Sequence, residues 1–488
     1  MRGGDMLKDF SSIWDYREFI SSHKSNLSES ERKRLDSKLF KSAIHKLKKL
    51  DVGLVSDVIA SSYSSYGRPA RDPSLLIRSF ILMNHLGYTS IHKWCDDLRN
   101  DNVLKYLLGT NEDLCVSNHY DFFERFTCKV HSRNELVKKD YFIKPKDKLK
   151  KGEKLVVKNT MSYTSALLDK YKNGTDPDTD RMLYRLQLIF NSLVVNPSLD
   201  KGYIDDNNLV LSGDGSSLHI HASVYPKKVK DGNEDEAIYR VSAPDANIGW
   251  DSDLGTYYLG YTFYNISYHN SKLGYDLPVY ITLDKASKHD APTSIEAFGQ
   301  LLCLNQSIHP KYVCLDSASD AMPICQFLHL NNIIPVIDHN KRSKKENPDN
   351  DEYINQDGIP VCKNKCTMIY HGYEVTRERK KYRCPLALGK ISSCPYVTEC
   401  CSTPYGRTMY VKDDYDIRVK GPLSYKSSTW KEIYKNRTST ERINNRVLND
   451  YKLHQFRVRD LAKNAFFSFI ACINIHLDVW NKLEEANT

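Results

Sequence analysis

The chain has 488 residues and a formal net charge of +9, which fits a polyanionic partner. Its length predicts roughly two to four domains rather than a single core. It contains no apolar span of about 18 residues and no apolar leader near the N-terminus, which argues against membrane and secreted classes. Thirteen cysteines without a secretion signal favour reduced thiols in a cytosol over a disulfide framework.

Residues 66–126 predict three short helices joined by tight turns. Asp72 and Pro73 form a helix start and Gly87 a stop, while Ser90 and Ser117 are expected to cap the next two helices. Helix-turn-helix readers of DNA are built from such units. The periodicity fits a plain three-helix bundle equally well, so both interpretations stay open.

A basic stretch follows at 135–159, where lysines alternate with aromatic residues. Its composition is that of a linker, and it fits either a solvated tether or a segment lying along a phosphate backbone. An amphipathic helix is expected at 181–195, ended by Asn196 and Pro197.

The central part of the chain changes to a β pattern. Strands are expected at 209–223, 257–269 and 277–284, followed by a helix at 291–304, a strand at 311–317, a helix at about 323–331 and a strand at 333–338. Alternation of strands with helices predicts an α/β sheet with helices on its faces. The order of three strands, helix, strand, helix, strand is that of the ribonuclease-H-like fold.

Asp214 stands in the middle of the first of these strands, in the run LVLSGDGSSLHIHASV. A central strand disfavours Asp, and a buried carboxylate is costly unless something pairs with it. Gly213 and Gly215 leave room for another molecule's backbone to approach. These features indicate an acid that holds a metal ion, although Gly-Asp-Gly also suits a turn.

Two further acids stand in similar contexts. Asp316 is expected to end the strand at 311–317, and the carboxyl ends of parallel strands are where α/β sheets place their sites. Glu441 lies in a predicted helix at 430–452, on one face with Tyr434 and Arg437. On its own, such a Glu among arginines is more typical of a solvated ion pair.

Together these residues carry a resemblance to bacterial insertion-sequence transposases of the DDE class. Tyr434, Arg437 and Glu441 match the branch that carries a Tyr-x2-Arg-x3-Glu-x6-Lys signature. The strand residues 214–216 resemble the first acidic motif, the segment 315–340 the second, and 66–94 the helical domain that opens many of these enzymes. The resemblance touches most of the chain from 60 to 480.

The resemblance implies a DNA transposase with a ribonuclease-H-like core, acting on terminal inverted repeats and target DNA, as a homodimer, in the bacterial cytoplasm near the nucleoid. Asp214, Asp316 and Glu441 would bind two Mg²⁺ or Mn²⁺ ions for strand cleavage and transfer. Tyr434 and Arg437 would contact DNA phosphates. Leu448 replaces the terminal lysine of the signature, so that role is either vacant or passes to Arg446 or Lys452.

An insertion of roughly ninety residues separates Asp316 from Glu441 and is rich in cysteine and basic residues. Because the insertion is basic, we expect that it could contact DNA. Structural Zn²⁺ and plain reduced thiols remain alternatives for its cysteines. The candidate zinc ligands are Cys362, Cys366, Cys384, Cys394 and Cys400.

Other polar residues have weaker claims to a role in catalysis. His219 and His221 form a His-x-His pattern that lacks the later ligands of zinc hydrolases. A hydrogen-bonding role is expected for His289, Asp290 and Asp338, near strand ends.

The predicted layout is a helical DNA-binding domain (1–130), a basic linker and helix (131–200), the first part of a catalytic core (201–340), the Cys-rich insertion (341–428) and the final core helices (429–488). Two other functions fit the same residues: a decayed or repurposed DNA-binding protein without cleavage, and a metal-dependent nuclease of the same fold.

Overall fold

The structure is a computed structural model of the chain. It describes residues 10–64, 66–127, 136–138, 163–172, 181–223, 227–229, 238–240, 242–340, 352–355, 357–401 and 403–487. The basic stretch 135–159 lies outside the described residues, except for the short strand β1 (Leu136–Lys138). No helix in the described part of the chain is long and apolar enough to cross a membrane.

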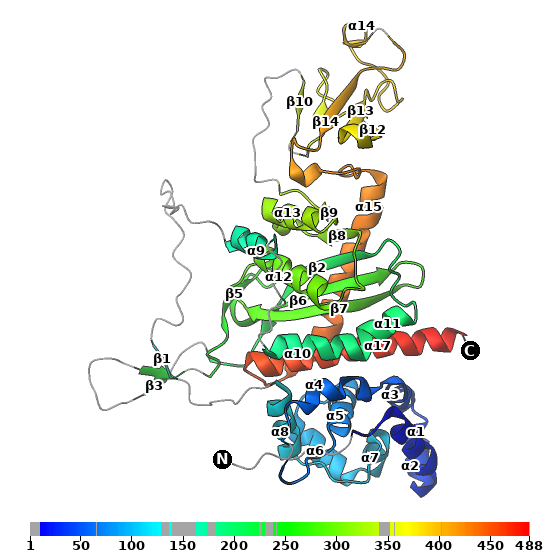
Figure 1. Cartoon of the computed structure of the whole chain (residues 1–488), viewed down its shortest axis with the longest axis vertical. Coiled ribbons are helices and arrows are strands. Elements are labelled where there is room, and N and C mark those ends of the chain that lie inside the picture. The colour runs from blue at the N-terminus through cyan, green and yellow to red at the C-terminus, as the bar shows by residue number, and fades with distance from the viewer. Residues whose placement is uncertain are drawn as a thin grey trace.

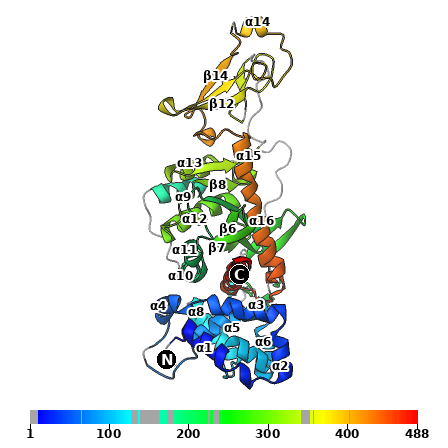
Figure 2. The same ribbon diagram turned by 90° about the vertical axis from the view of Figure 1, so that its right-hand side faces the viewer.

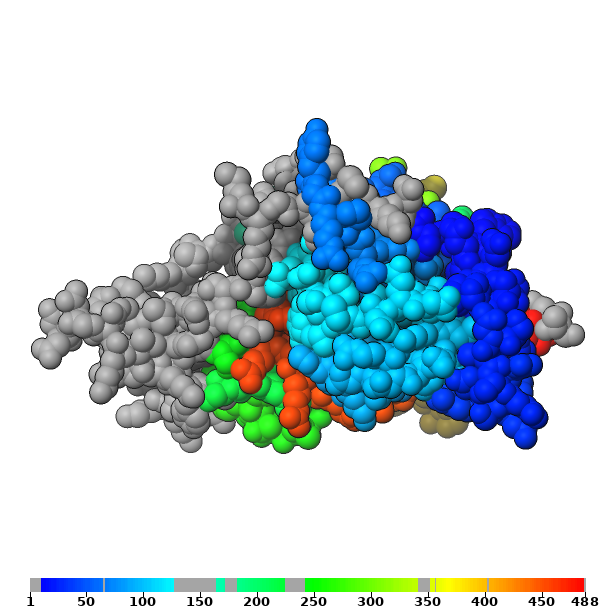
Figure 3. Space-filling model, turned by 90° about the horizontal axis from the view of Figure 1, so that it is seen from below, coloured from blue at the N-terminus to red at the C-terminus, as the bar shows by residue number. Residues whose placement is uncertain are grey.

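Helices make up the N-terminal part of the molecule, at the bottom of Figure 1. Seen from below, their blue and cyan residues form much of that end of the molecule (Figure 3). Those helices are α1 (Ile13–Ser22), η1 (Lys24–Asn26), α2 (Glu29–Leu35), α3 (Lys38–Lys49), η2 (Val52–Val55), α4 (Ser56–Ala60), α5 (Pro73–His85), α6 (Ile91–Asn100), α7 (Asn102–Leu108) and α8 (Val116–Thr127).

The caps of α5 and α6 are those the sequence predicts. Asp72 accepts a hydrogen bond from Ser74 N, and Ser90 accepts one from Lys93 N. The prediction was wrong for the third helix, because α8 begins at Val116 and Ser117 lies inside it. It also omitted α7, which Asp101 caps and which ends at Gly109.

A six-stranded mixed sheet occupies the centre of the molecule, with strands β7, β6, β2, β8 and β9 side by side in that order and β5 also paired with β6. β2, β6 and β7 are antiparallel neighbours, whereas β2, β8 and β9 run parallel. The strands of this sheet are β2 (Val210–His219), β5 (Asn247–Asp251), β6 (Thr256–Asn270), β7 (Tyr275–Lys285), β8 (Tyr312–Leu315) and β9 (Ile334–Ile337).

Helices cover both faces of this sheet (Figure 2). One face carries α12 (Asp290–Leu304), with α9 (Tyr163–Lys172) and α13 (Met322–Leu330) beside it, and the other carries a nearly continuous helical segment that contains α16. That segment consists of α15 (Ser428–Tyr434), η8 (Lys435–Arg437), α16 (Thr438–Asn445) and the π-helical η9 (Arg446–Asp450), so the helix predicted at 430–452 is present but interrupted.

Two long helical segments lie between the sheet and the N-terminal helices. They are α17 (Leu461–Asn487) and a segment made of α10 (Arg181–Phe190), the π-helical η4 (Asn191–Val195) and α11 (Asn196–Asp200). Pro197 was expected to end a helix at 195. It stands instead in the first turn of α11, directly after the π-helical η4, and the helical segment continues past it to Asp200.

Burial shows how these parts are joined. One continuous apolar core includes residues from the N-terminal helices, the sheet, α12 and α17, among them Phe80, Tyr264 and Phe466. Lys46 of α3 is buried beside α17, where its Nζ lies 2.7 Å from Asp478 Oδ1. The N-terminal helices are therefore packed onto the rest of the protein by both apolar and ionic contacts.

The insertion between β9 and α15 has an apolar core of its own, which includes Cys362, Met368, Tyr382 and Val411. Its main sheet has the order β12-β13-β14. The remaining described elements are η5 (Ser317–Ser319), η7 (Ile417–Val419), η10 (Leu453–Gln455), β3 (Lys227–Val229), β4 (Ile238–Arg240), β10 (Tyr353–Ile354), β11 (Pro360–Val361), β12 (Ile369–Glu374), η6 (Val375–Arg377), β13 (Arg379–Arg383), α14 (Val397–Cys400) and β14 (Thr408–Lys412).

Candidate active site

Asp214 lies in β2, the strand at which the antiparallel and parallel halves of the sheet meet. It is paired in register with Asn265 of β6, and its Oδ1 accepts a hydrogen bond of 2.9 Å from Gly215 N. The strand therefore places a carboxylate at the centre of the sheet, as its sequence indicates, and the turn alternative is excluded.

The glycines on either side of Asp214 are needed for the protein's own packing. A Cβ at Gly213 would lie 2.5 Å from the hydroxyl of Tyr264 and 3.0 Å from the ring of Phe298. A Cβ at Gly215 would overlap the carboxylate of Asp290. The space beside these glycines was expected to admit another molecule's backbone. It is occupied instead by side chains of this chain.

Asp316 follows the last residue of β8 and caps the short helix η5. Its Oδ1 accepts hydrogen bonds of 3.2 Å from both the N–H and the hydroxyl of Ser319. Because Ser212 of β2 is in register with Cys314 of β8, the two strands bring Asp214 and Asp316 to neighbouring positions. The strand stops one residue before Asp316, since this carboxylate caps the next turn.

Asp290 is a third carboxylate near this point. It is the first residue of α12, which covers the face of the sheet opposite to α16. Its carboxylate packs against Gly215, where there is no side chain to exclude it. Burial and the charge of Asp316 raise its pKa. A hydrogen-bonding role was expected for this residue, and no sequence motif distinguishes it from the acids that commonly begin helices.

The electrostatics of Asp214 reflect this crowding. Burial is the main cause that raises its pKa to about 7, and the charges of Asp316 and Asp290 raise it further. Arg437 and the N–H of Gly215 act in the opposite direction. Around this carboxylate, like charges and desolvation outweigh the nearby cation, which is a pattern typical of functional sites.

The helical segment α15–η9 is fixed to the sheet by buried polar contacts. The hydroxyls of Ser439 and Ser267 are 2.7 Å apart, and Asn265 Nδ2 donates to Asn444 Oδ1 at 2.7 Å. These contacts determine which side of α16 faces β2 and β6.

Glu441 is half exposed and is joined to the buried acids through Arg437. Arg437 Nη2 donates to Glu441 Oε1 at 2.6 Å, while its Nη1 lies 4.0 Å from Asp214 Oδ2. The hydrogen bond to Glu441 raises the pKa of Arg437 against the effect of burial. The structure thus brings Asp214 and Asp316 together, and it connects Glu441 to them by a guanidinium.

The other residues assigned to DNA contact have partners in the described structure. Tyr434 stacks on Trp430 with ring centroids 4.5 Å apart, and burial raises its pKa to about 12. Arg446 donates to Asp478 Oδ2 at 2.6 Å. Lys452 Nζ lies 3.4 Å from the carbonyl oxygen of Gly87.

No group of three or more His, Cys, Asp or Glu side chains within the described residues is arranged to hold a metal ion. The donor set nevertheless fits Mg²⁺ chemically, since hard divalent ions prefer carboxylate oxygens. Asp214 is crowded by two further carboxylates, and a divalent cation would balance this charge.

The cysteines of the insertion lie around a tight turn. Cys362 N donates to the carbonyl oxygen of Cys366 at 3.0 Å, which folds 362–366 back on itself. Burial raises the pKa values of Cys366 and Cys400, and the thiols of Cys362 and Cys394 contribute in both cases. Cys384 packs against Gly406 instead.

The two histidines of the His-x-His pattern make local hydrogen bonds, and only His219 lies in β2, which ends there rather than at the expected residue 223. His219 Nε2 lies 2.8 Å from Asp251 Oδ2 and its ring stacks on Tyr258. His221 Nε2 contacts the carbonyl oxygen of His454 at 3.1 Å. Their positions are explained by these contacts.

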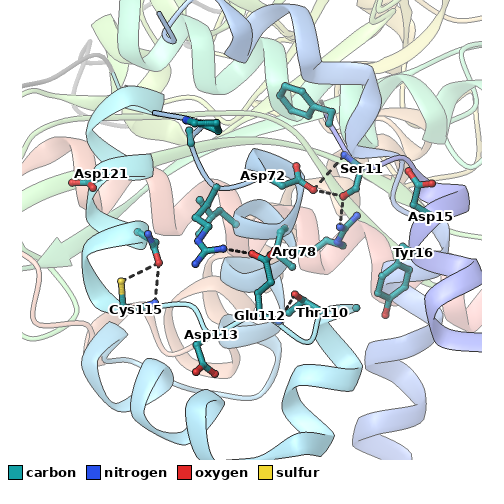
Figure 4. A pocket seen from close by; sticks show the side chains of 18 of the residues that line it. Ser11, Asp15, Tyr16, Asp72, Arg78, Thr110, Glu112, Asp113, Cys115 and Asp121 are labelled. Carbon is teal, nitrogen blue, oxygen red and sulfur yellow. Dashed lines mark hydrogen bonds and ion pairs between the residues drawn. The ribbon is translucent and has the colours of Figure 1, made fainter. Parts of the chain in front are cut away.

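A cavity of about 900 Å³ lies in the N-terminal helical part, and the carboxylate cluster at Asp214 does not line it (Figure 4). Arg78 is almost fully buried there and donates from Nη2 to Ser11 Oγ at 2.7 Å. Ser11 in turn donates to Asp72. Acids and arginines both line this cavity, so it has no strong preference for ligands of one charge.

No known protein family matches the chain, and no curated protein sequence matches it.

Proposed function

We propose that the protein is a DNA transposase that cleaves DNA strands and joins them by divalent-metal phosphodiester chemistry. The observation that supports this most is the carboxylate cluster at Asp214, where burial, Asp316 and Asp290 raise the pKa of Asp214 to about 7. A protein gains nothing in stability from such a group, because burying unpaired like charges is costly. Functional sites are where this cost is found.

The fold of the core supports the same proposal. The order β7, β6, β2, β8, β9, with three antiparallel strands followed by two parallel ones, agrees with a ribonuclease-H-like core. Asp214 and Asp316 occupy adjacent strands of it, and Glu441 comes from a helix packed across β2 and β6. The insertion lies between the second and third of these acids.

In this proposal Asp214, Asp316 and Glu441 would hold two Mg²⁺ or Mn²⁺ ions, which would activate a water or 3′-hydroxyl and stabilise the leaving oxygen. Arg437 contributes a planar guanidinium beside the buried acids, where it can bind two oxygens of the scissile phosphate. Tyr434, held by Trp430, lines the same approach. A homodimer on two DNA ends follows from the resemblance alone.

The exposure of Glu441 and its bond to Arg437 favour a second candidate, a DNA-binding protein of the same fold without cleavage. A nicking assay separates the two. Wild type is incubated with DNA that carries the sequences flanking the gene, with Mg²⁺ or Mn²⁺, and compared with Asp214→Asn, Asp316→Asn and Glu441→Gln.

The transposase proposal requires nicking by wild type and its loss in all three variants, with DNA binding retained. Glu432→Gln is a matched control, because Glu432 is an exposed acid on the same helical segment. Binding without nicking by wild type would support the non-catalytic candidate. Nicking without joining to target DNA would support a nuclease.

A further inference from the structure

The three-stranded sheet of the insertion has one buried and one exposed face. In β13, Lys380 and Tyr382 are buried while Arg379, Lys381 and Arg383 alternate with them on the other side. Since side chains alternate along a strand, these three cations share one face. The buried face packs into the core around Tyr382, so the cationic face is turned outward.

The neighbouring strands extend this charge. Lys412 of β14 is in register with Arg379, and Tyr410 is in register with Lys381, so both belong to the same face. Glu374 of β12 is the acid on this face, opposite Arg379. We call this surface the basic face, defined by Arg379, Lys381, Arg383, Lys412 and Tyr410; even counting Glu374, it carries an excess of positive charge.

Aromatic rings hold the arginines in place. The guanidinium of Arg379 lies 3.9 Å from the ring centroid of Tyr410, and that of Arg383 lies 3.6 Å from the ring centroid of Tyr405. Lys381 Nζ donates to the hydroxyl of Tyr405 at 2.8 Å. Arg379 is also paired with Glu374, whose Oε2 accepts from its Nε at 2.7 Å. The ring contacts orient Lys381 and Arg383 without neutralising them, so less conformational entropy is lost when an anion binds.

The spacing suits a linear polyanion. Alternate residues of a strand are about 6.6 Å apart, so Arg379, Lys381 and Arg383 form a regular row. This separation is comparable to that of successive phosphates along one nucleic-acid strand. A single small anion would engage one of these cations, whereas a phosphate backbone can engage several.

We infer that the basic face is a docking surface for the phosphate backbone of duplex DNA, at the opposite end of the molecule from the N-terminal helices (Figure 1). The inference rests on the proposed function for the identity of the polyanion. It gives the insertion a role of its own, which is to hold DNA away from the acids at Asp214. The contact reads no sequence, because it involves phosphates alone.

The test is the salt dependence of binding to a fluorescein-labelled duplex of random sequence, measured with the full chain by fluorescence anisotropy. Each lost phosphate contact lowers the slope of log Kobs against log salt by about 0.9. Lys381→Gln/Lys412→Gln should therefore reduce the slope by about 2. The charge-matched control Lys272→Gln/Lys285→Gln changes two exposed lysines, one in the turn after β6 and one at the end of β7, and should leave the slope as in wild type.

Arg383→Gln provides an independent measurement and should lower the slope by about 1. Unchanged slopes in both basic-face variants, with far-ultraviolet circular dichroism as in wild type, would overturn the inference. That result would leave the proposed function intact, because nicking depends on the acids. Conversely, a wild-type protein that never nicks DNA but shows the expected slopes would refute the transposase proposal and retain the basic face.

Discussion

Replacing Asp214 by Asn should stabilise the metal-free protein, and the gain should grow with pH. The folded protein raises the pKa of Asp214 from 3.8 to about 7, so the folded state retains a proton that the unfolded state releases between these values. Stability of the wild type must therefore fall as pH rises through this window. Asn carries no charge at any of these pH values, so the stability of Asp214→Asn should not fall with pH for this reason.

The magnitude follows from the shift. A difference of about 3 pKa units at 1.36 kcal/mol per unit gives about 4 kcal/mol at pH 8, as an upper value, and less than about 1 kcal/mol at pH 4. Urea unfolding followed by tryptophan fluorescence in EDTA, at pH 4 and pH 8, measures the difference between the two proteins. Asp206→Asn, an exposed acid in the turn before β2, is the control and should show no such trend.

Equal stability of wild type and Asp214→Asn at pH 8 would refute the argument that this carboxylate is crowded and desolvated. A gain that is the same at pH 4 and pH 8 would also contradict it, because the cause would then not be ionisation. Adding Mg²⁺ should stabilise wild type at pH 8 and leave Asp214→Asn unchanged, if the proposed metal role is correct.

Three further changes probe other parts of the structure. Gly215→Ala should destabilise by about 1–3 kcal/mol because its Cβ overlaps Asp290, and Asp290→Ala should relieve the loss in a double-mutant cycle measured by urea unfolding. Asp478→Asn leaves the buried ammonium of Lys46 without its anionic partner and should lower the free energy of unfolding by about 3–5 kcal/mol. For the cysteines of the insertion, elemental analysis of purified protein decides between the two alternatives: bound Zn²⁺ that Cys362→Ser/Cys366→Ser removes would support structural zinc, and zinc-free wild type would support reduced thiols.

The central strands were predictable because their residues are locally consistent. β6 and β7 are rich in aromatic and β-branched residues, and their bounds differ from the expected ones by only one or two residues at each end. The strand order could not be obtained from periodicity, which says nothing about pairing.

The insertion and Asp290 show where sequence reasoning failed. β13 reads RKKYR and has no apolar alternation, because one of its two buried positions is Lys380, near Asp413. Asp290 resembles an ordinary acid in the first turn of a helix. Its place near Asp214 depends on the missing side chain of Gly215, a contact between segments 75 residues apart in the chain.

The arrangement around Asp214 also explains why Arg437 lies where it does. α12 brings Asp290 to β2 from one face of the sheet, and the segment α15–η9 brings Arg437 and Glu441 from the other. The guanidinium lies 4.0 Å from Asp214 Oδ2 and 2.6 Å from Glu441 Oε1, so it is a counter-charge for both carboxylates. Under the proposed function, Arg437 would also contact a phosphate beside these acids, because its planar guanidinium can bind two oxygens at once.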